Sequence, residues 1–226
     1  RKPSIYDVAA VAGVSHQTVS RVLNEHPNIR ATTRDRVLAA IDQVGYTRNS
    51  IARALATNRT KRIGVLVDTP VQFGPGSTVR GVEEAARAAG YSVITTSVGD
   101  SAETGVGAGV EYLISQGVDA LCVVAPRSSS LEALARHHPG IPTLVISSEA
   151  EPDMLSASVD QQTGAREVMA HLLALGHRRI LHLAGPRDWL DAREREIAWR
   201  AMLEGVGAEI IEPTVGDWTS DSGYEY

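Results

Sequence analysis

The sequence predicts a small all-α domain joined to a larger α/β domain, and three observations lead to this fold class. Residues 1–62 contain 11 Lys and Arg against 4 Asp and Glu, whereas residues 63–226 contain 11 against 23. Short helical patterns with one apolar face fill the basic part, and apolar strands alternate with helices in the acidic part. A basic module on an acidic body is typical of a polyanion-binding domain attached to a second domain, although a solvated basic surface without a partner has the same charge.

The first 46 residues have the pattern of a helix-turn-helix domain. Apolar side chains recur at helical spacing in residues 5–12, 16–24 and 33–44. Gly13 separates the first two helices and permits the positive φ that a tight turn needs, and Gly45 ends the third. We therefore predict a helix-turn-helix domain over residues 1–46.

The second of these helices presents a polar outer face. Its apolar residues account for the inner face, which leaves His16, Gln17, Ser20 and Arg21 pointing outward. Such side chains suit base edges and phosphates in the major groove of double-stranded DNA. A generic three-helix bundle is the structural alternative, but it gives no reason for this combination on one exposed face.

The same residues resemble the LacI family of bacterial repressors. The similarity is specific in residues 5–9 (IYDVA) and 12–24 (AGVSHQTVSRVLN), and it continues in residues 49–55 (NSIARAL). The resemblance implies that His16, Gln17 and Arg21 read base edges. It also implies a set of residues that contact the DNA backbone, namely Ser15, Thr18, Ser20, Asn24, Tyr46 and Asn49.

Residues 47–61 are predicted to form a hinge. Residues 49–56 could form two turns of helix, but an isolated helix this short is marginal in water. We therefore expect the segment to fold when it binds DNA. The resemblance implies that Ala54 and Leu55 enter the minor groove and that Leu55 acts as the wedge. The alternative is that Leu55 packs against the following domain.

Residues 62–226 are predicted to form an α/β domain for effector sensing and dimerisation. Continuous apolar strands between helices indicate a parallel sheet covered on both faces. The strand-like runs are residues 63–67, 93–96, 120–125, 143–146 and 180–183, with helical stretches at 78–89, 109–116 and 164–175.

An internal repeat suggests that this domain has two similar lobes. A strand opens at Ile63 and a turn follows at Gly90, 27 residues on; Ile180 and Gly207 repeat this spacing with an offset of 117 residues. Two such lobes would form a cleft like that of the periplasmic sugar-binding proteins, although similar strand–helix–strand units can share a length by coincidence. The strand at residues 119–125 would recur at about residue 236, so we expect the second lobe to be incomplete, with an unpaired apolar edge.

Effector contacts are expected where strands end at the cleft. Ser147 follows the predicted strand at residues 143–146, and Asp160 follows a short predicted strand that ends at Val159. The resemblance implies that Arg195 holds the effector and that Trp218 lines its pocket. Arginine can bind hydroxyls or a carboxylate in a bidentate manner, and an indole can stack on a sugar ring. The alternatives are surface salt bridging for Arg195 and core packing for Trp218.

Motifs for catalysis and cofactor binding are missing from the sequence. No Gly-x-Gly-x-x-Gly follows a strand, and no Walker loop or Gly-x-Ser-x-Gly elbow occurs. The histidines lack metal-ligand spacing with the single cysteine, Cys122. We therefore expect no enzyme activity, cofactor or metal, and we expect a cytoplasmic protein without a membrane segment.

These features predict a transcription regulator, a repressor in particular. A homodimer would bind a near-palindromic operator in double-stranded DNA, under the control of a small-molecule effector such as a sugar or a related metabolite. Two alternatives remain: a ligand-binding module with incidental DNA affinity, and a sugar-processing α/β enzyme with a DNA-binding appendage.

Overall fold

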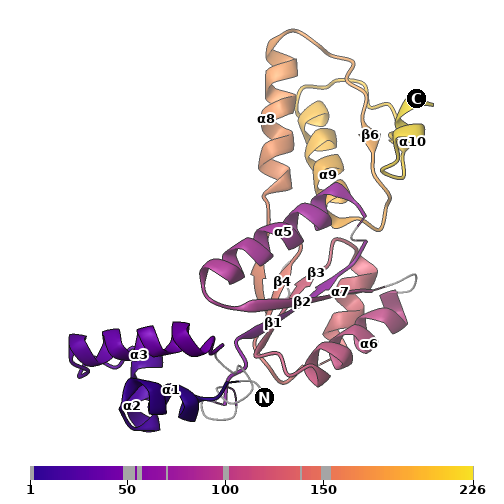
Figure 1. Cartoon of the computed structure of the whole chain (residues 1–226). Helices are drawn as coiled ribbons and strands as arrows, with labels where there is room; N and C mark the ends of the chain where they lie inside the picture. The colour runs from indigo at the N-terminus through magenta and orange to yellow at the C-terminus, as the bar shows by residue number, and fades with distance from the viewer. Residues whose placement is uncertain are drawn as a thin grey trace. The chain divides into compact units, whose positions relative to one another are not determined.

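The computed structural model describes residues 3–47, 54, 58–69, 71–98, 102–137, 139–148 and 154–225. The chain divides into two compact units, Arg1–Asn58 and Arg59–Tyr226, which are described separately. Figure 1 shows their helices and strands along the chain. Among the described residues, no helix is long and apolar enough to cross a membrane.

The first unit contains three helices: α1 (Ile5–Ala12), α2 (His16–Leu23) and α3 (Ala31–Val44). At the start of α1, the Ser4 backbone N–H donates to the Asp7 carboxylate at 2.7 Å. Gly13 has φ 64°, so the chain turns between α1 and α2 as predicted. Val8, Val19 and Val37 are fully buried, one from each helix, and they form a small shared core.

The second unit begins with a parallel five-stranded sheet in the order β2-β1-β3-β4-β5. The first four strands agree with the predicted runs to within one residue at either end, because each is a continuous apolar or alternating segment. The fifth strand ends at Ala157, two residues before Val159, where a short strand was predicted to end. The bounds are Arg62–Val67 for β1, Ser92–Ser97 for β2, Ala120–Val124 for β3, Thr143–Ile146 for β4 and Leu155–Ala157 for β5.

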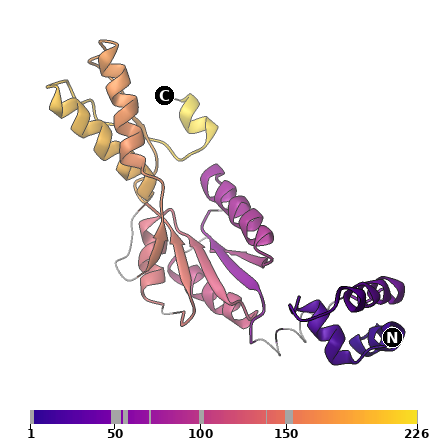
Figure 2. The ribbon, with the colours of Figure 1, turned by 90° about the vertical axis from the view of Figure 1, so that its left-hand side faces the viewer.

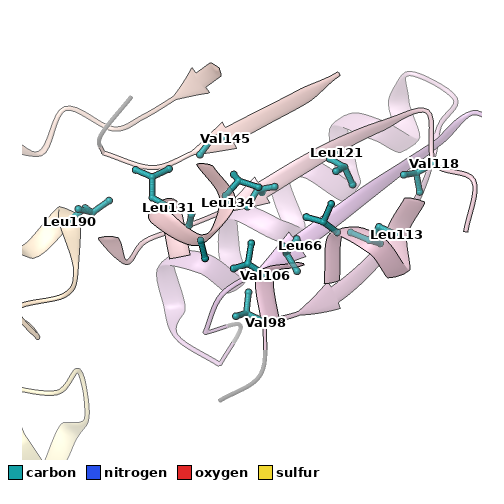
Figure 3. Packing of buried hydrophobic residues seen from close by; sticks show 14 residues of the cluster. Leu66, Val98, Val106, Leu113, Val118, Leu121, Leu131, Leu134, Val145 and Leu190 are labelled. Carbon is teal, nitrogen blue, oxygen red and sulfur yellow. The ribbon is translucent and has the colours of Figure 1, made fainter. Parts of the chain in front are cut away.

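Helices cover both faces of this sheet. Figures 1 and 2 show α5 (Phe73–Ala88) on one face, with α6 (Ala102–Ser115) and α7 (Ser128–Ala135) side by side on the other. Figure 3 shows the core beneath α6 and α7, where Leu66 and Leu121 of the sheet meet helical residues such as Leu113 and Leu134. We call the five-stranded sheet, together with α5, α6 and α7, the first lobe.

The second lobe contains two long helices and a small sheet (Figure 1). Strands β6 and β7 pair in parallel over only two residues each. The predicted strand at residues 180–183 was therefore wrong over most of its length. Ile180 packs instead beside Met169 and Trp199 in the core of this lobe. The bounds are Gln161–Ala174 for α8, Leu183–Ala184 for β6, Leu190–Gly205 for α9, Thr214–Val215 for β7 and Ser220–Tyr224 for α10.

One helix of each lobe repeats at the predicted spacing, although the strands do not: β1 has six residues and β6 has two. Helices α5 and α9 are both 16 residues long, and both of their ends are offset by 117 residues. Each is followed by a glycine with positive φ, 74° at Gly90 and 64° at Gly207. The repeat in the sequence therefore corresponds in the structure to the helix and the turn that follows it.

The start of α6 packs very closely against the end of β2. A Cβ placed on Gly105 would lie 1.8 Å from the carbonyl oxygen of Val98, which is far too close for any side chain. Because the clashing atom belongs to the backbone, a rotamer change cannot relieve the overlap. Glycine at this position is therefore required by packing and not by φ.

We predict that Gly105→Ala lowers the free energy of unfolding by about 1–3 kcal/mol, because the added methyl group must push α6 away from the sheet. The matched control is Gly81→Ala in α5, where a Cβ would meet nothing within 4 Å. That change should stabilise the protein by about 0.5–1 kcal/mol through helix propensity. Denaturant unfolding of both variants measures the difference, and equal stabilisation by both would contradict the close packing.

Candidate functional site

Helix α2 carries an exposed polar surface in the first unit. Ser15 caps the helix, and its hydroxyl accepts a hydrogen bond from the Thr18 backbone N–H at 3.2 Å. His16, Gln17 and Arg21 are all exposed, while Val19 and Val22 of the same helix are buried. The three predicted base-reading side chains thus lie on the side of α2 away from the domain core.

The residues predicted to contact phosphates differ in their exposure to solvent. Ser15 and Asn24 are exposed, Thr18 and Ser20 are half-buried, and Tyr46 packs partly against the helix core. Ala54 is helical and half-buried. Asn49 and Leu55 lie outside the described residues.

A cavity of about 260 Å³ lies between the two lobes of the second unit. The first lobe contributes Ser147, which is buried, together with Ser148 at the end of β4. The second lobe contributes Trp189 and Asp191 from the start of α9. The Ser148 hydroxyl donates a hydrogen bond to the Asp191 carboxylate across the cavity wall. The cavity therefore combines hydroxyls, one carboxylate and an indole.

A second cavity, of about 360 Å³, is lined by α8, α9 and residues 180–182. Asp160 and Arg195 line it, whereas Ser147 lines the cavity between the lobes and Trp218 is among the lining residues of neither. Val159 and Gln161 line both cavities and separate them. Arg195 donates a hydrogen bond to the Gln161 side-chain oxygen at 2.7 Å, which connects the two sets of residues.

Asp160 has a local structural role. Its carboxylate accepts a hydrogen bond from the Thr163 backbone N–H at 2.8 Å and caps α8. Hydrogen bonds from Thr163 hold the pKa of this exposed carboxyl below its ordinary value. Asp160 is therefore charged at neutral pH and already has a partner.

His182 lines the second cavity and lies over Trp199, with ring centroids 5.3 Å apart. Burial lowers its pKa, the Glu196 charge opposes this and the Arg195 charge adds to it, and the net shift is downward, so the imidazole is neutral at physiological pH. Its Nε2 atom is buried and has no hydrogen-bond partner among the described residues.

Trp218 lies next to both Arg195 and Trp189. The Arg195 guanidinium is 5.5 Å from one ring of Trp218, and the Trp189 ring approaches edge-on at 5.6 Å. Trp218 has φ 69°, a left-handed backbone conformation that a bulky residue rarely adopts. Its indole covers Gly185, where a Cβ would lie 2.0 Å from the ring. With 38% of its surface exposed, Trp218 is not a core residue.

Three residues that line the cavity between the lobes were not predicted from the sequence, namely Ser148, Trp189 and Asp191. The repeat contained a signal for two of them, because an offset of 117 residues places Asp191 opposite Gly74 and Trp189 opposite Gln72. Gly74 and Asp191 both line the cavity between the lobes, at the starts of α5 and α9. The offset of 117 residues relates the start of α5 to the start of α9. It therefore predicts that both helices begin at the cavity between the lobes.

Comparisons with known families cover nearly the whole chain. Residues 4–49 match the family model of bacterial regulatory proteins of the lacI family. Residues 60–223 match the model described as periplasmic binding proteins and sugar binding domain of the LacI family. The lactose operon repressor of Escherichia coli (strain K12) is 32% identical over 226 residues, which cover 98% of this chain and 62% of the repressor. The chain thus spans less than two thirds of the length of that relative.

Solved structures of two transcriptional regulators also resemble this chain along nearly its whole length. The lac repressor dimer bound to operator and the anti-inducer ONPF matches with a TM-score of 0.83 and 32% identity, over 100% of this chain and 68% of the repressor chain. A complex of the transcriptional regulator CelR with cellobiose matches with a TM-score of 0.61 and 28% identity, over 99% and 68% of the two chains.

We predict that Gly185→Ala displaces the Trp218 indole, because the new methyl group would occupy the position of the ring. The edge-on contact with Trp189 would be lost, which should change the near-ultraviolet circular dichroism and the tryptophan fluorescence. Gly205→Ala is the control, since a Cβ there meets nothing within 4 Å. Identical spectra for the two variants would show that Trp218 does not lie on Gly185 in solution.

Proposed function

The chain belongs to the LacI family of bacterial regulatory proteins, and from this we propose that it represses transcription by binding operator DNA under the control of a small molecule. The observation that carries the proposal is the exposed polar face of α2, with His16, Gln17 and Arg21, in the same chain as a cavity between two lobes. The local net charge of +7 in residues 1–62 supports an anionic partner.

For DNA binding, we propose a homodimer on a near-palindromic site. The two α2 helices would enter successive major grooves about one helical turn apart, as is general for dimeric helix-turn-helix proteins. His16, Gln17 and Arg21 would read bases, and the backbone contacts predicted above would fix the register. Ala54 and Leu55 would enter the minor groove between the half-sites. The operator complex of the lac repressor supports this arrangement.

For the effector, we propose a sugar or a related polyhydroxylated metabolite. Ser147, Ser148 and Asp191 offer oxygen atoms to hydroxyl groups, and the Trp189 indole offers an apolar face to a sugar ring. Arg195 and Trp218 would contact the part of the ligand nearest the second cavity. The cellobiose complex of CelR supports a carbohydrate.

Effector binding would change the arrangement of the lobes and thereby the DNA affinity. A coupling of about 1–3 kcal/mol is ordinary for such linkage. The named relatives are regulators, which supports a role in regulation and not in catalysis. Because the proposed target is chromosomal DNA, the protein would act in the cytoplasm at the nucleoid.

Selection of bound duplexes from a random DNA pool tests this function against a ligand-binding module with incidental DNA affinity. A palindromic consensus at moderate salt is the expected result. Strongly salt-dependent binding without any consensus would mean that only phosphates are contacted, and it would overturn the proposal. Turnover of a bound sugar would instead favour an enzyme.

We predict that Arg21→Ala weakens binding to the selected operator by about 1–3 kcal/mol and relaxes the preference at one base position. Fluorescence anisotropy with the operator and its single-base variants measures both effects. Arg36→Ala in α3 is the control, because it removes an equal charge from an exposed position outside α2. If Arg21→Ala weakened binding equally on all sequences, Arg21 would be a phosphate contact and not a base-reading residue.

We predict that Trp189→Ala and Arg195→Ala each lower the affinity for a bound sugar by about 1–3 kcal/mol, through loss of the aromatic face and of a charged hydrogen bond. Calorimetric titration with a panel that includes cellobiose and lactose measures this. Arg187→Ala is the control, since Arg187 is exposed and lines neither of the two cavities. Unchanged affinity in both test variants would exclude the cavity between the lobes as the binding site.

A further inference from the structure

Four consecutive residues of the first lobe, 127–130, hold two carboxylates from distant parts of the second unit. The Arg127 guanidinium donates to both oxygens of Asp68, each at 2.6 Å, and the Ser130 hydroxyl also donates to Asp68. Asp68 is fully buried and directly follows β1. This side of the cluster therefore belongs entirely to the first lobe.

The other side of the cluster reaches the second lobe. Asp188, which lies two residues before α9, accepts hydrogen bonds from the Ser128 hydroxyl at 2.6 Å and the Ser129 hydroxyl at 2.8 Å. The backbones also pair: Ser128 N–H donates to the Asp188 carbonyl at 3.0 Å, and Leu190 N–H donates to the Pro126 carbonyl at 2.9 Å. We call the contact of Ser128 and Ser129 with Asp188 the α9 clamp.

Helix α9 is shared between the cores of the two lobes. Leu190, its first residue, is fully buried in the first-lobe core, and Figure 3 shows it beside Leu131 of α7. Trp199 and Leu203, further along the same helix, are buried in the second-lobe core with Met169. Arg195 lies between these two anchored parts. A single rigid element therefore joins both lobes and carries an effector residue in its middle.

We propose that the α9 clamp is a conformational control point, at which Asp188 holds the start of α9 on the first lobe and so sets the arrangement of the two lobes. Two hydroxyls on one carboxylate form charge-assisted hydrogen bonds, which are stronger than neutral ones. The proposal concerns regulation of the cleft in the proposed function, but its test requires neither effector nor DNA.

The clamp also connects α9 with the strand that leads toward the first unit along the chain. Asp188 is held by Ser128 and Ser129, and the preceding residue, Arg127, holds Asp68 at the end of β1. A movement of α9 thus acts on the same four-residue segment that fixes β1. Such a chain of contacts becomes a coupling pathway only if removal of one part changes the response of the other.

Distance measurements between spin labels in the two lobes test the proposal. Labels on Glu111→Cys in α6 and Glu167→Cys in α8 are suitable because both positions are exposed. The native Cys122 can stay, since it is buried and burial raises its pKa to about 11, which keeps it as an unreactive thiol. The background is the full chain carrying this label pair.

Asp188→Ala and the double variant Ser128→Ala/Ser129→Ala should both broaden the distance distribution and shift its mean to longer values. All three changes combined should have no larger effect than either alone, because they remove the same contact. Glu212→Gln is the control, since it removes the charge of an exposed carboxylate that pairs with Arg200 inside the second lobe. It should leave the distribution unchanged.

Three outcomes would overturn the proposal. One is an unchanged distribution in a folded Asp188→Ala protein, with folding checked by circular dichroism. Another is additive effects of the two clamp variants. The third is unfolding of both variants but not of Glu212→Gln, which would make the clamp a requirement for folding and not a control of lobe arrangement. If the distances change as expected but no sugar or DNA binds, the clamp stands and the proposed function fails.

Discussion

The buried carboxylate of Asp68 is the constraint on which the second unit depends. An ionised carboxylate without solvent is stable only when it is paired and fully hydrogen-bonded. Arg127 and Ser130 meet this requirement from the start of α7, which follows β3. Their pairing fixes the carboxyl end of β1 against the segment after β3. The cavity between the lobes and the contact with Asp188 are both built at this edge of the sheet, so their geometry depends on the same pair.

The parts of the fold that the sequence predicted well are those with local causes. The bounds of α1 were predicted to the residue because Ser4, Asp7 and Gly13 act within one or two turns of the helix. Strands β1 and β3 were recognisable as apolar runs, since both of their faces are covered. The strand predicted at residues 180–183 failed for a non-local reason. A strand forms only where a partner supplies hydrogen bonds, and β6 has a partner for Leu183 and Ala184 alone among the described residues.

In the candidate site too, the residues with a local cause could be predicted and those with a non-local cause could not. Ser147 could be predicted because it directly follows a strand, and polar residues at the carboxyl end of parallel strands gather at one edge. Arg195 and Trp218 came from the family resemblance, and the structure brings them within 5.5 Å of each other. Trp189 and Asp191 had no local signal, because they reach the cavity only through the pairing of residues 188–190 with residues 126–128. Only the internal repeat, which relates the starts of α5 and α9, contained this information.

Helix α9 packs into the cores of both lobes, and this limits how it can move. Leu190 and Leu203 are both fully buried, and they lie in different cores about 20 Å apart along the axis of α9. A helix of this length is stiff, so a displacement of its middle must be taken up at its ends, either in the packing of one core or in the contacts of Asp188. Close-packed cores resist small displacements, whereas hydroxyl–carboxylate bonds at a half-buried position can exchange partners. A ligand that displaced Arg195 would therefore act on the contacts of Asp188, next to residues that also hold Asp68 and, through it, β1.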